Sequence, residues 1–596
     1  MKIRALALMT LTVLLASCST KTEKQTTTTT DTQSGSAATT PAAPASTGGK
    51  ADTLVIQEAS DIPTMDPGTS YDSASSSLLE NVYETLVTYK GSSISELQGQ
   101  LATEWQASDD GLTYRFTLRP DVKFHSGNPF TCADAEYTFQ RNLVTNTGDS
   151  GNWFISESLL GTPANANDDS SVTWAKIDGA VQCDGETLVF TLPKADPAFV
   201  SKLAYLGQAI VDSKHAQAVG EWDGTEKTWK ENVGKDLTGS PLAQKPSGTG
   251  PYQMVSKDAT GYIFKAFDGY WGGAPAIKNV VRQIVPEQAS RLQALQAGDA
   301  DIVETGGREI IENQLSGQPG ITVLDNLPNV AVTAITLNQK IAEGNPAGQL
   351  NEQSIPSDFF ADADVRRAFV NAFDYQTFID QVQMGKGELL NVALPKSFMG
   401  YDPALEPQAT NVEAATEAFK KAFGGKLWDT GFTVEMNYRE GSIPMQTALE
   451  MFKTNIESIN PKFHVNLVGK QWSEILDAGR SGKLAMMEAG WSPDYADPDN
   501  FITTFYASNG FYKPRSNIND PELDKMISEA RSVTDEAKRK ELYAQIARRA
   551  QDQAYYILLP SAVQVRAVNS KLQGFTAENF NPLYGGDVLW KSMTKN

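Results

Sequence analysis

Histidine and cysteine are scarce in this chain of 596 residues. Its three histidines, His125, His215 and His464, are far apart in sequence, and neither an HExxH nor a CxxC spacing occurs. These spacings are typical of zinc sites, so we expect no metal centre. The G-x-S-x-G and P-loop motifs are also missing, which removes the sequence signals of two common enzyme classes.

Positive charge is in the minority as well. The chain has 51 Lys and Arg against 72 Asp and Glu, a formal net charge of −21. Such a surface repels phosphate backbones, so we expect no nucleic-acid partner. We interpret the acidity as maintaining solubility, in preference to attracting cationic ligands. Long apolar runs are absent after residue 17, which predicts no membrane-spanning helix beyond that point.

The N-terminus does contain an apolar run. Lys2 and Arg4 precede the 11 apolar-rich residues 5–15, which are too few for a spanning helix of about 20 residues. The segment Leu15-Ala16-Ser17-Cys18 resembles the end of a bacterial lipoprotein signal peptide. The resemblance implies a signal peptide over 1–17 and lipidation of Cys18; the alternative is an ordinary signal peptide followed by an unmodified cysteine.

Residues 18–50 consist almost entirely of Thr, Ser, Ala, Pro, Gly, Gln and Lys. This composition has no periodic apolar residues from which to build a core, and it predicts a disordered tether. We therefore expect an extracytoplasmic protein, in the periplasm or at the cell surface, that is attached to a membrane by its lipid and begins to fold after Lys50.

Two further cysteines are Cys132 and Cys183. An even pair in an oxidising compartment favours a disulfide, although two buried free thiols would fit the same sequence.

Helical and strand periodicities alternate along the rest of the chain. Residues 78–87 have a helical apolar face, with a possible N-cap among serines 75–77. The run Thr53-Leu54-Val55-Ile56 predicts a first strand. Period-two alternation predicts further strands at 114–118, 188–192 and 432–436, and helical spacing predicts helices at 365–373 and 542–550. This mixture predicts an α/β fold with several sheets.

Six sequence blocks occur in a characteristic order: Trp105–Gly127, Gly248–Tyr252, Tyr270–Gly273, Arg291–Asp301, Asp364–Ala368 and Trp491–Phe501. Together they resemble the extracytoplasmic solute-binding proteins of oligopeptide and dipeptide ABC importers, solute-binding protein family 5. The resemblance covers nearly all of residues 51–596.

The resemblance implies a two-lobed periplasmic-binding-protein-like fold of type II, with an additional subdomain in the first lobe. Lobe I would comprise 51–90, 233–327 and 561–596, the subdomain 91–232, and lobe II 328–560. It also implies a monomer without cofactors or enzymatic activity, which binds a peptide between its lobes and delivers it to ABC permease subunits.

The resemblance also implies a ligand site. Asp494, three residues after Trp491, matches the aspartate that pairs with the α-amino group of the ligand; the alternative is a loop carboxylate or helix cap. Tyr71 falls where the family lines its cleft, although it would equally suit a core. Trp491 and Tyr495 are further candidates for ligand contact.

Glu488 departs from the family pattern. Some oligopeptide-binding members have an arginine at this position, three residues before the tryptophan, which meets the ligand carboxylate. With Glu488 there, the ligand would differ in length, be cationic, or not be a peptide, unless Glu488 is only a solvated rim residue. An oligosaccharide or another non-peptide solute is the second hypothesis for the ligand. A secreted hydrolase with paired carboxylates is the third hypothesis for function.

Overall fold

The computed structural model describes residues 51–147, 150–343, 347–583 and 587–596. The signal peptide, the lipidated Cys18 and the tether predicted for residues 1–50 lie outside the described residues. Within the described part, no helix is both long enough and apolar enough to cross a membrane.

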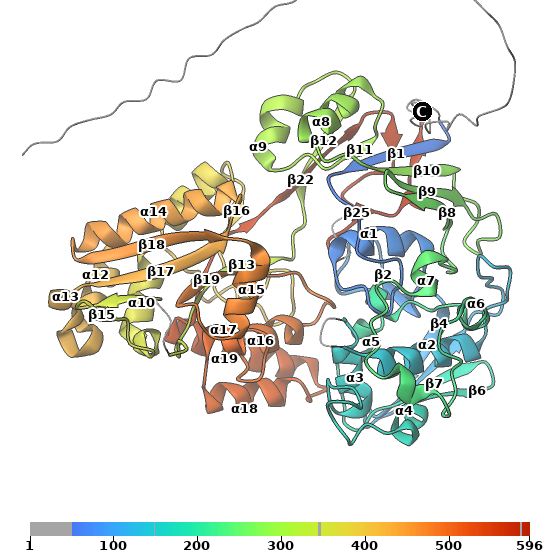
Figure 1. The fold of residues 1–596 in the computed structure, drawn as a ribbon, viewed down its shortest axis with the longest axis horizontal. Coiled ribbons are helices and arrows are strands. Elements are labelled where there is room, and N and C mark those ends of the chain that lie inside the picture. Colours follow the sequence, from blue (N-terminus) through green and yellow to red (C-terminus); the bar gives the residue numbers. More distant parts are fainter. Residues whose placement is uncertain (1–50, 148–149, 344–346, 584–586) are drawn as a thin grey trace, which may run out of the picture. The chain divides into compact units, whose positions relative to one another are not determined.

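The first of two large sheets is built from both ends of the chain (Figure 1). Its central strand β1 (Thr53–Glu58) is buried from Thr53 to Gln57, with Leu54, Val55 and Ile56 at its centre, as expected for a strand with parallel neighbours on both sides. In spatial order its seven strands are β12 (Ile321–Leu327), β22 (Gln564–Asn569), β11 (Ile302–Val303), β1, β10 (Asn279–Ile284), β9 (Gly261–Ala266) and β8 (Tyr252–Asp258).

A four-stranded antiparallel sheet belongs to the segment inserted between β1 and β8. Its strands are β4 (Ala102–Ala107), β5 (Thr113–Leu118), β7 (Thr187–Thr191) and β6 (Val181–Asp184). Tyr114, Phe116 and Leu118 are buried and alternate with half-buried or exposed residues, so the predicted strand is confirmed. Helices α2 (Cys132–Thr145) and α4 (Trp174–Ala180) pack against this sheet, and α3 (Trp153–Leu160) packs against α4.

A disulfide joins Cys132, the first residue of α2, to Cys183 in β6, and thereby confirms the predicted pairing over free thiols. The bond fixes the start of the helix to the edge strand of the four-stranded sheet.

Replacing both cysteines by serine is expected to lower the free energy of unfolding by about 2–4 kcal/mol, because the bond closes a long loop in the unfolded chain. Urea denaturation of the double variant tests this. A midpoint equal to that of the oxidised parent would contradict it.

A buried ion-pair network joins the inserted segment to the first large sheet. The Arg141 guanidinium on α2 donates to Asp66 at 2.6 and 3.0 Å and to Glu221 at 2.8 Å. Ser240 donates to the same Asp66 carboxylate at 2.6 Å. The side chains of Arg141, Asp66 and Glu221 are at most 2% exposed. Asp66 lies in the loop after β1, so the network connects the inserted segment to the loop that follows the central strand of the first large sheet.

The second large sheet is formed by the middle of the chain. Its strands, in spatial order, are β15 (Gln353–Ser354), β14 (Gly348–Leu350), β17 (Phe432–Arg439), β19 (Met486–Trp491), β13 (Val332–Leu337) and β20 (Tyr556–Leu558), with β18 (Phe463–Lys470) also paired to β17. Apolar clusters on this sheet pack against α10 (Ala363–Ala372), α12 (Val412–Lys421), α14 (Ile443–Ile459), α16 (Pro498–Tyr506), α18 (Pro521–Ala530) and α19 (Glu536–Gln553).

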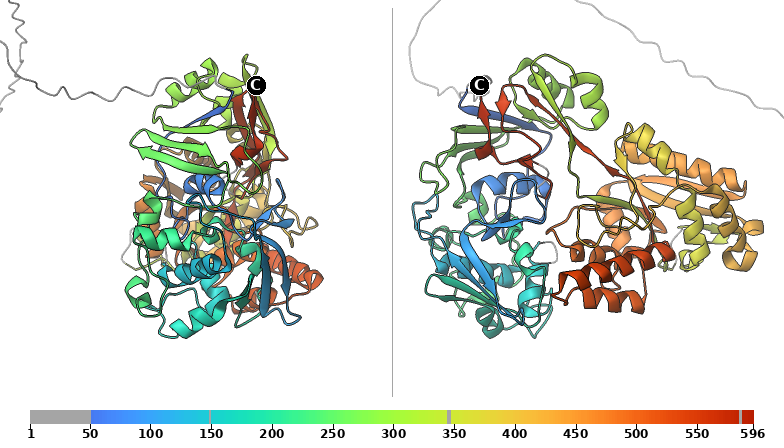
Figure 2. Two further views of the ribbon diagram at one scale, coloured as in Figure 1. Left: turned by 90° about the vertical axis from the view of Figure 1, so that its right-hand side faces the viewer. Right: turned by 180° about the vertical axis from the view of Figure 1, so that it is seen from behind.

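The chain passes between the two large sheets twice, and the two crossings lie side by side (Figure 2). One runs from β12 to β13 and the other from β20 to β22. Leu327 pairs with Gln564 at one end, and the Leu559 amide donates to the Thr333 carbonyl at the other, at 2.9 Å. Between these pairs the Asn329 side chain donates to the Ala562 carbonyl at 2.7 Å.

Helix α1 (Ser73–Val82) is shorter than its sequence pattern suggested. Asp72, and not one of the serines, is the N-cap: its carboxylate accepts from the Ser75 amide at 2.7 Å. The helix ends at Val82, whose carbonyl accepts from the Gly250 amide at 3.0 Å. A Cβ at Gly248 would lie 2.0 Å from that carbonyl oxygen. The glycines of the Gly248–Tyr252 block therefore permit close backbone contact.

Candidate functional site

The loop after β19 reaches from the second large sheet to residues of the first lobe. Its Asp494 Oδ2 accepts from the Tyr71 hydroxyl at 3.2 Å, although the two residues are 423 positions apart. Two residues further on, the Ala496 amide donates to the Tyr89 hydroxyl at 3.0 Å. Tyr71 itself accepts from the Trp153 indole at 3.2 Å. The structure thus brings together Asp494 and Tyr71, two of the predicted site residues.

Asn500 on α16 holds the Asp494 loop in shape. Its side-chain oxygen accepts from the Trp491 indole at 2.8 Å and from the Asp494 amide at 3.1 Å. Its side-chain nitrogen donates to Asp494 Oδ2 at 3.0 Å. Sequence reasoning did not single out Asn500, although it belongs to the Trp491–Phe501 block.

Asp494 is a half-buried carboxyl without a cationic partner among the described residues. Burial raises its pKa to about 7, and the hydrogen bonds from Asn500 and Tyr71 oppose that rise. A carboxyl in this environment gains most when a positive group approaches it, because desolvation has left its charge uncompensated.

The neighbouring aspartates have structural roles. Asp497 caps α16 by accepting from the Asp499 amide at 3.0 Å, and Arg539 contacts both of its oxygens at 2.8 and 3.0 Å. Asp499 lies in the first turn of α16, in which Pro498 occupies the first helical position. Its carboxylate accepts from the Tyr495 hydroxyl at 3.1 Å.

A cleft of about 400 Å³ lies beside Tyr71. Its walls come from the loop before α1, from the inserted segment and from the loop after α16, and include Tyr71, Asn146, Trp153, Glu157, Thr504 and Phe511.

The other three predicted residues have different surroundings. Trp491 is half-buried, and its ring lies 5.1 Å from that of Phe511, a residue of the cleft wall. Tyr495 is 2% exposed and packs into the first apolar cluster, with its ring 5.2 Å from Phe154. Glu488 is half-buried on β19 and accepts from the Arg439 amide at 3.3 Å; burial raises its pKa. Neither Tyr495 nor Glu488 belongs to the cleft wall described above.

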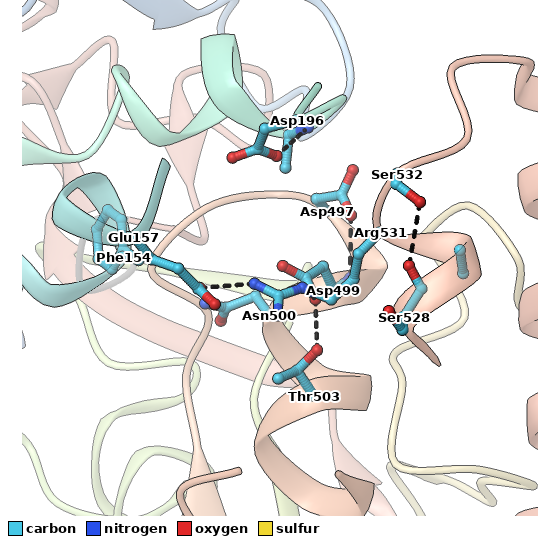
Figure 3. Close-up of polar contacts among 12 residues, drawn as sticks. Phe154, Glu157, Asp196, Asp497, Asp499, Asn500, Thr503, Ser528, Arg531 and Ser532 are labelled. Atoms are coloured by element: carbon cyan, nitrogen blue, oxygen red, sulfur yellow. Dashed lines mark hydrogen bonds and ion pairs between the residues drawn. The ribbon is translucent and has the colours of Figure 1, made fainter. Parts of the chain in front are cut away.

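Arg531, just after α18, bridges the two sides of the cleft (Figure 3). Its guanidinium donates to Glu157 on α3 at 2.6 Å and lies 2.9 Å from Asp499 on α16. Sequence reasoning missed this bridge, because nothing local to Arg531 indicates a partner 374 residues away.

Across the described ranges, no group of three or more His, Cys, Asp or Glu is arranged to hold a metal ion. The cleft wall offers carboxylates, hydroxyls, side-chain amides and aromatic rings.

Two large sheets, each packed with helices, are joined by two chain crossings, and segments from both parts line a cleft. This arrangement defines a two-lobed solute-binding protein. The chain belongs to the bacterial extracellular solute-binding proteins, family 5, whose middle-region profile matches residues 96–513. The predicted fold class and the family resemblance are both confirmed.

The chain is also similar to several known binding proteins. It is 27% identical over 543 residues to the probable D,D-dipeptide-binding periplasmic protein DdpA of Escherichia coli K12, covering 89% of this chain and 92% of that protein. It is 26% identical over 539 residues to heme-binding protein A of Haemophilus influenzae, covering 87% and 88%. Among solved structures, DppA of Helicobacter pylori in complex with the peptide STSA superposes with a TM-score of 0.69 at 22% identity, covering 91% and 98%.

Proposed function

We propose that this chain is a binding protein, without enzymatic activity, that captures short peptides between its lobes and delivers them to an ABC permease. The proposal rests on the surroundings of the Asp494 carboxyl. This half-buried group has a pKa raised to about 7 and hydrogen-bond partners from both lobes, Tyr71 and Asn500. A peptide α-amino group would supply the positive charge that this carboxylate lacks.

Main-chain recognition would complete the binding mode. Hydrogen bonds to an extended peptide give affinity without reading its sequence. Glu488 stands where some oligopeptide-binding members have an arginine, so the carboxyl end of the peptide would be bound elsewhere or remain hydrated.

Each proposed lobe contains one of the two large sheets. Lobe I comprises 51–90, 233–327 and 561–596, with 91–232 as its subdomain, and lobe II comprises 328–560. The paired crossings near Leu327 and Pro560 would form the hinge. A ligand that contacts both lobes stabilises the closed arrangement, which a permease then recognises. A lipid on Cys18 would keep the protein near that permease and raise its local concentration.

Ligand identity is tested by thermal shift with panels of peptides and oligosaccharides. A ligand at a hundredfold excess over its Kd adds about 2.7 kcal/mol of stability. We expect peptides to raise the melting temperature and sugars to leave it unchanged. The reverse result would favour the oligosaccharide hypothesis, and turnover of a bound ligand would favour the hydrolase. Mass spectrometry of ligands released from the purified protein gives an independent answer.

Peptide affinity is expected to depend on pH through Asp494. The ionised carboxylate is the form that binds an amine, and its pKa is raised to about 7. Lowering the pH from 7.5 to 5.5 should therefore weaken binding by about 20- to 30-fold, since each pKa unit corresponds to a tenfold change. Calorimetric titration across this range tests the expectation.

The variant Asp494→Asn provides the control for that titration, and its peptide affinity should show no comparable dependence on pH.

In the absence of peptide, the pH dependence of protein stability should have the opposite sign. Between the ordinary carboxyl pKa of 3.8 and about 7, the folded protein retains a proton that the unfolded chain has lost. The stability of the parent protein should thus fall as pH rises through this window, and that of the variant should not. Parallel profiles for the two proteins would contradict the role of Asp494.

A further inference from the structure

Three aromatic side chains from separate parts of the chain line the cleft beside Asp494. They are Tyr71 before α1, Trp153 at the start of α3, and Phe511 after α16. Phe511 is 47% exposed, one of few large apolar residues with so much free surface in the described part of the chain. An exposed aromatic ring inside a cleft is a contact surface for an apolar group.

The polar groups of Trp153 and Tyr71 already have hydrogen-bond partners within the protein. The Trp153 indole donates to the Tyr71 hydroxyl, which in turn donates to Asp494. The rings therefore present apolar faces and edges, without leaving an indole or hydroxyl group that a ligand side chain would have to satisfy.

The charge around the cleft is predominantly negative. Glu157 and Asp168 are part of the wall, and Asp494 is bonded to it through Tyr71. Arg531 is the cation of the same wall, but Glu157 and Asp499 already neutralise it at 2.6 and 2.9 Å. An acidic ligand side chain entering here would meet like charges without an available counter-ion on this wall.

We propose that this pocket selects the first side chain of the peptide, and that it prefers an aromatic or large apolar side chain to a small one and disfavours an acidic one. The inference rests on the proposed function, because it takes Asp494 as the partner of the α-amino group. Tyr71 contacts Asp494 and also forms part of the pocket wall. The side chain that branches next to the bound amine is therefore the one that the pocket can reach.

The test uses calorimetric titration of the full-length protein with four tripeptides: Phe-Ala-Ala, Ala-Ala-Phe, Ala-Ala-Ala and Glu-Ala-Ala. We expect Phe-Ala-Ala to bind about tenfold more tightly than Ala-Ala-Ala, as burial of part of a phenyl ring would give. Ala-Ala-Phe has the same composition and should bind like Ala-Ala-Ala, and Glu-Ala-Ala should bind most weakly.

Two variants assign the preference to the pocket. Phe511→Ala should reduce the advantage of Phe-Ala-Ala over Ala-Ala-Ala, both measured on the variant, to threefold or less. Trp472→Ala removes another exposed aromatic, 38% exposed on α15 (Trp472–Arg480), which is not part of the cleft wall. It should leave the whole series unchanged.

The outcomes separate this inference from the function on which it rests. If all four peptides bind with equal affinity, or if the preference survives Phe511→Ala, the pocket assignment is wrong and peptide binding stands. If Ala-Ala-Phe matches Phe-Ala-Ala, the assignment to the first position is wrong. If none of the peptides binds, both proposals fail.

Discussion

Asp494→Asn is expected to weaken peptide binding by about 2–5 kcal/mol, or roughly 30-fold to several thousand-fold in Kd. The substitution keeps the size of the side chain but removes the charge that would pair with the α-amino group. Much of the loss would come from leaving the ammonium group of the ligand desolvated and unpaired. Calorimetry with a tripeptide at pH 7.5 measures the change.

A matched control is Asp402→Asn, the same substitution on the same lobe. The Asp402 carboxylate lies 2.7 Å from Arg548 and accepts from the Ala404 amide at 3.0 Å, and it is not part of the cleft wall. Its loss should leave peptide affinity unchanged. If Asp494→Asn binds as tightly as this control, Asp494 is not the partner of the peptide amine.

Arg141→Met is expected to lower the free energy of unfolding by about 3–5 kcal/mol. The guanidinium neutralises Asp66 and Glu221, and all three side chains are at most 2% exposed. Methionine has no charge, so two carboxylates would remain buried without a counter-ion. Urea denaturation followed by circular dichroism measures the loss.

The control is Arg115→Met, in the same inserted segment. Arg115 pairs with Asp184, but the two side chains are 48% and 70% exposed, so the expected loss is below about 1 kcal/mol. If Arg141→Met does not fold, adding Asp66→Asn and Glu221→Gln should restore folding by removing the unpaired charges. An Arg141→Met protein as stable as the Arg115→Met control would contradict this account of the network.

The periodic elements could be predicted from the sequence because their signals are local. The strand at Tyr114–Leu118 and the helix at Val365–Phe373 have alternating or helical apolar residues, and each forms close to the expected position. The end of α1 could not be predicted in this way. Leu86 and Val87 continue the helical spacing, but the helix stops at Val82, where the backbone of Gly248 and Gly250 packs against it.

The residues of the candidate site were predictable one at a time, but their arrangement was not. The family resemblance indicated Asp494 and Tyr71, each from its own motif. The hydrogen bond between them depends on how segments more than 400 residues apart are brought together, which no local pattern encodes. The surroundings of Tyr495 could not be predicted from a local pattern either. Its aromatic ring would suit a ligand contact or a core, and it is buried beside Phe154.

The burial of Tyr495 has a consequence for how the proposed cleft opens and closes. Its ring belongs to the loop after β19 but packs in the first apolar cluster, so opening the proposed cleft would withdraw it into water, at a cost of about 1.5–3 kcal/mol. The protein itself therefore supplies part of the free energy of closure, and less is taken from the ligand. The same contact would slow release of a bound ligand, because this ring must leave the first apolar cluster before the proposed cleft can open.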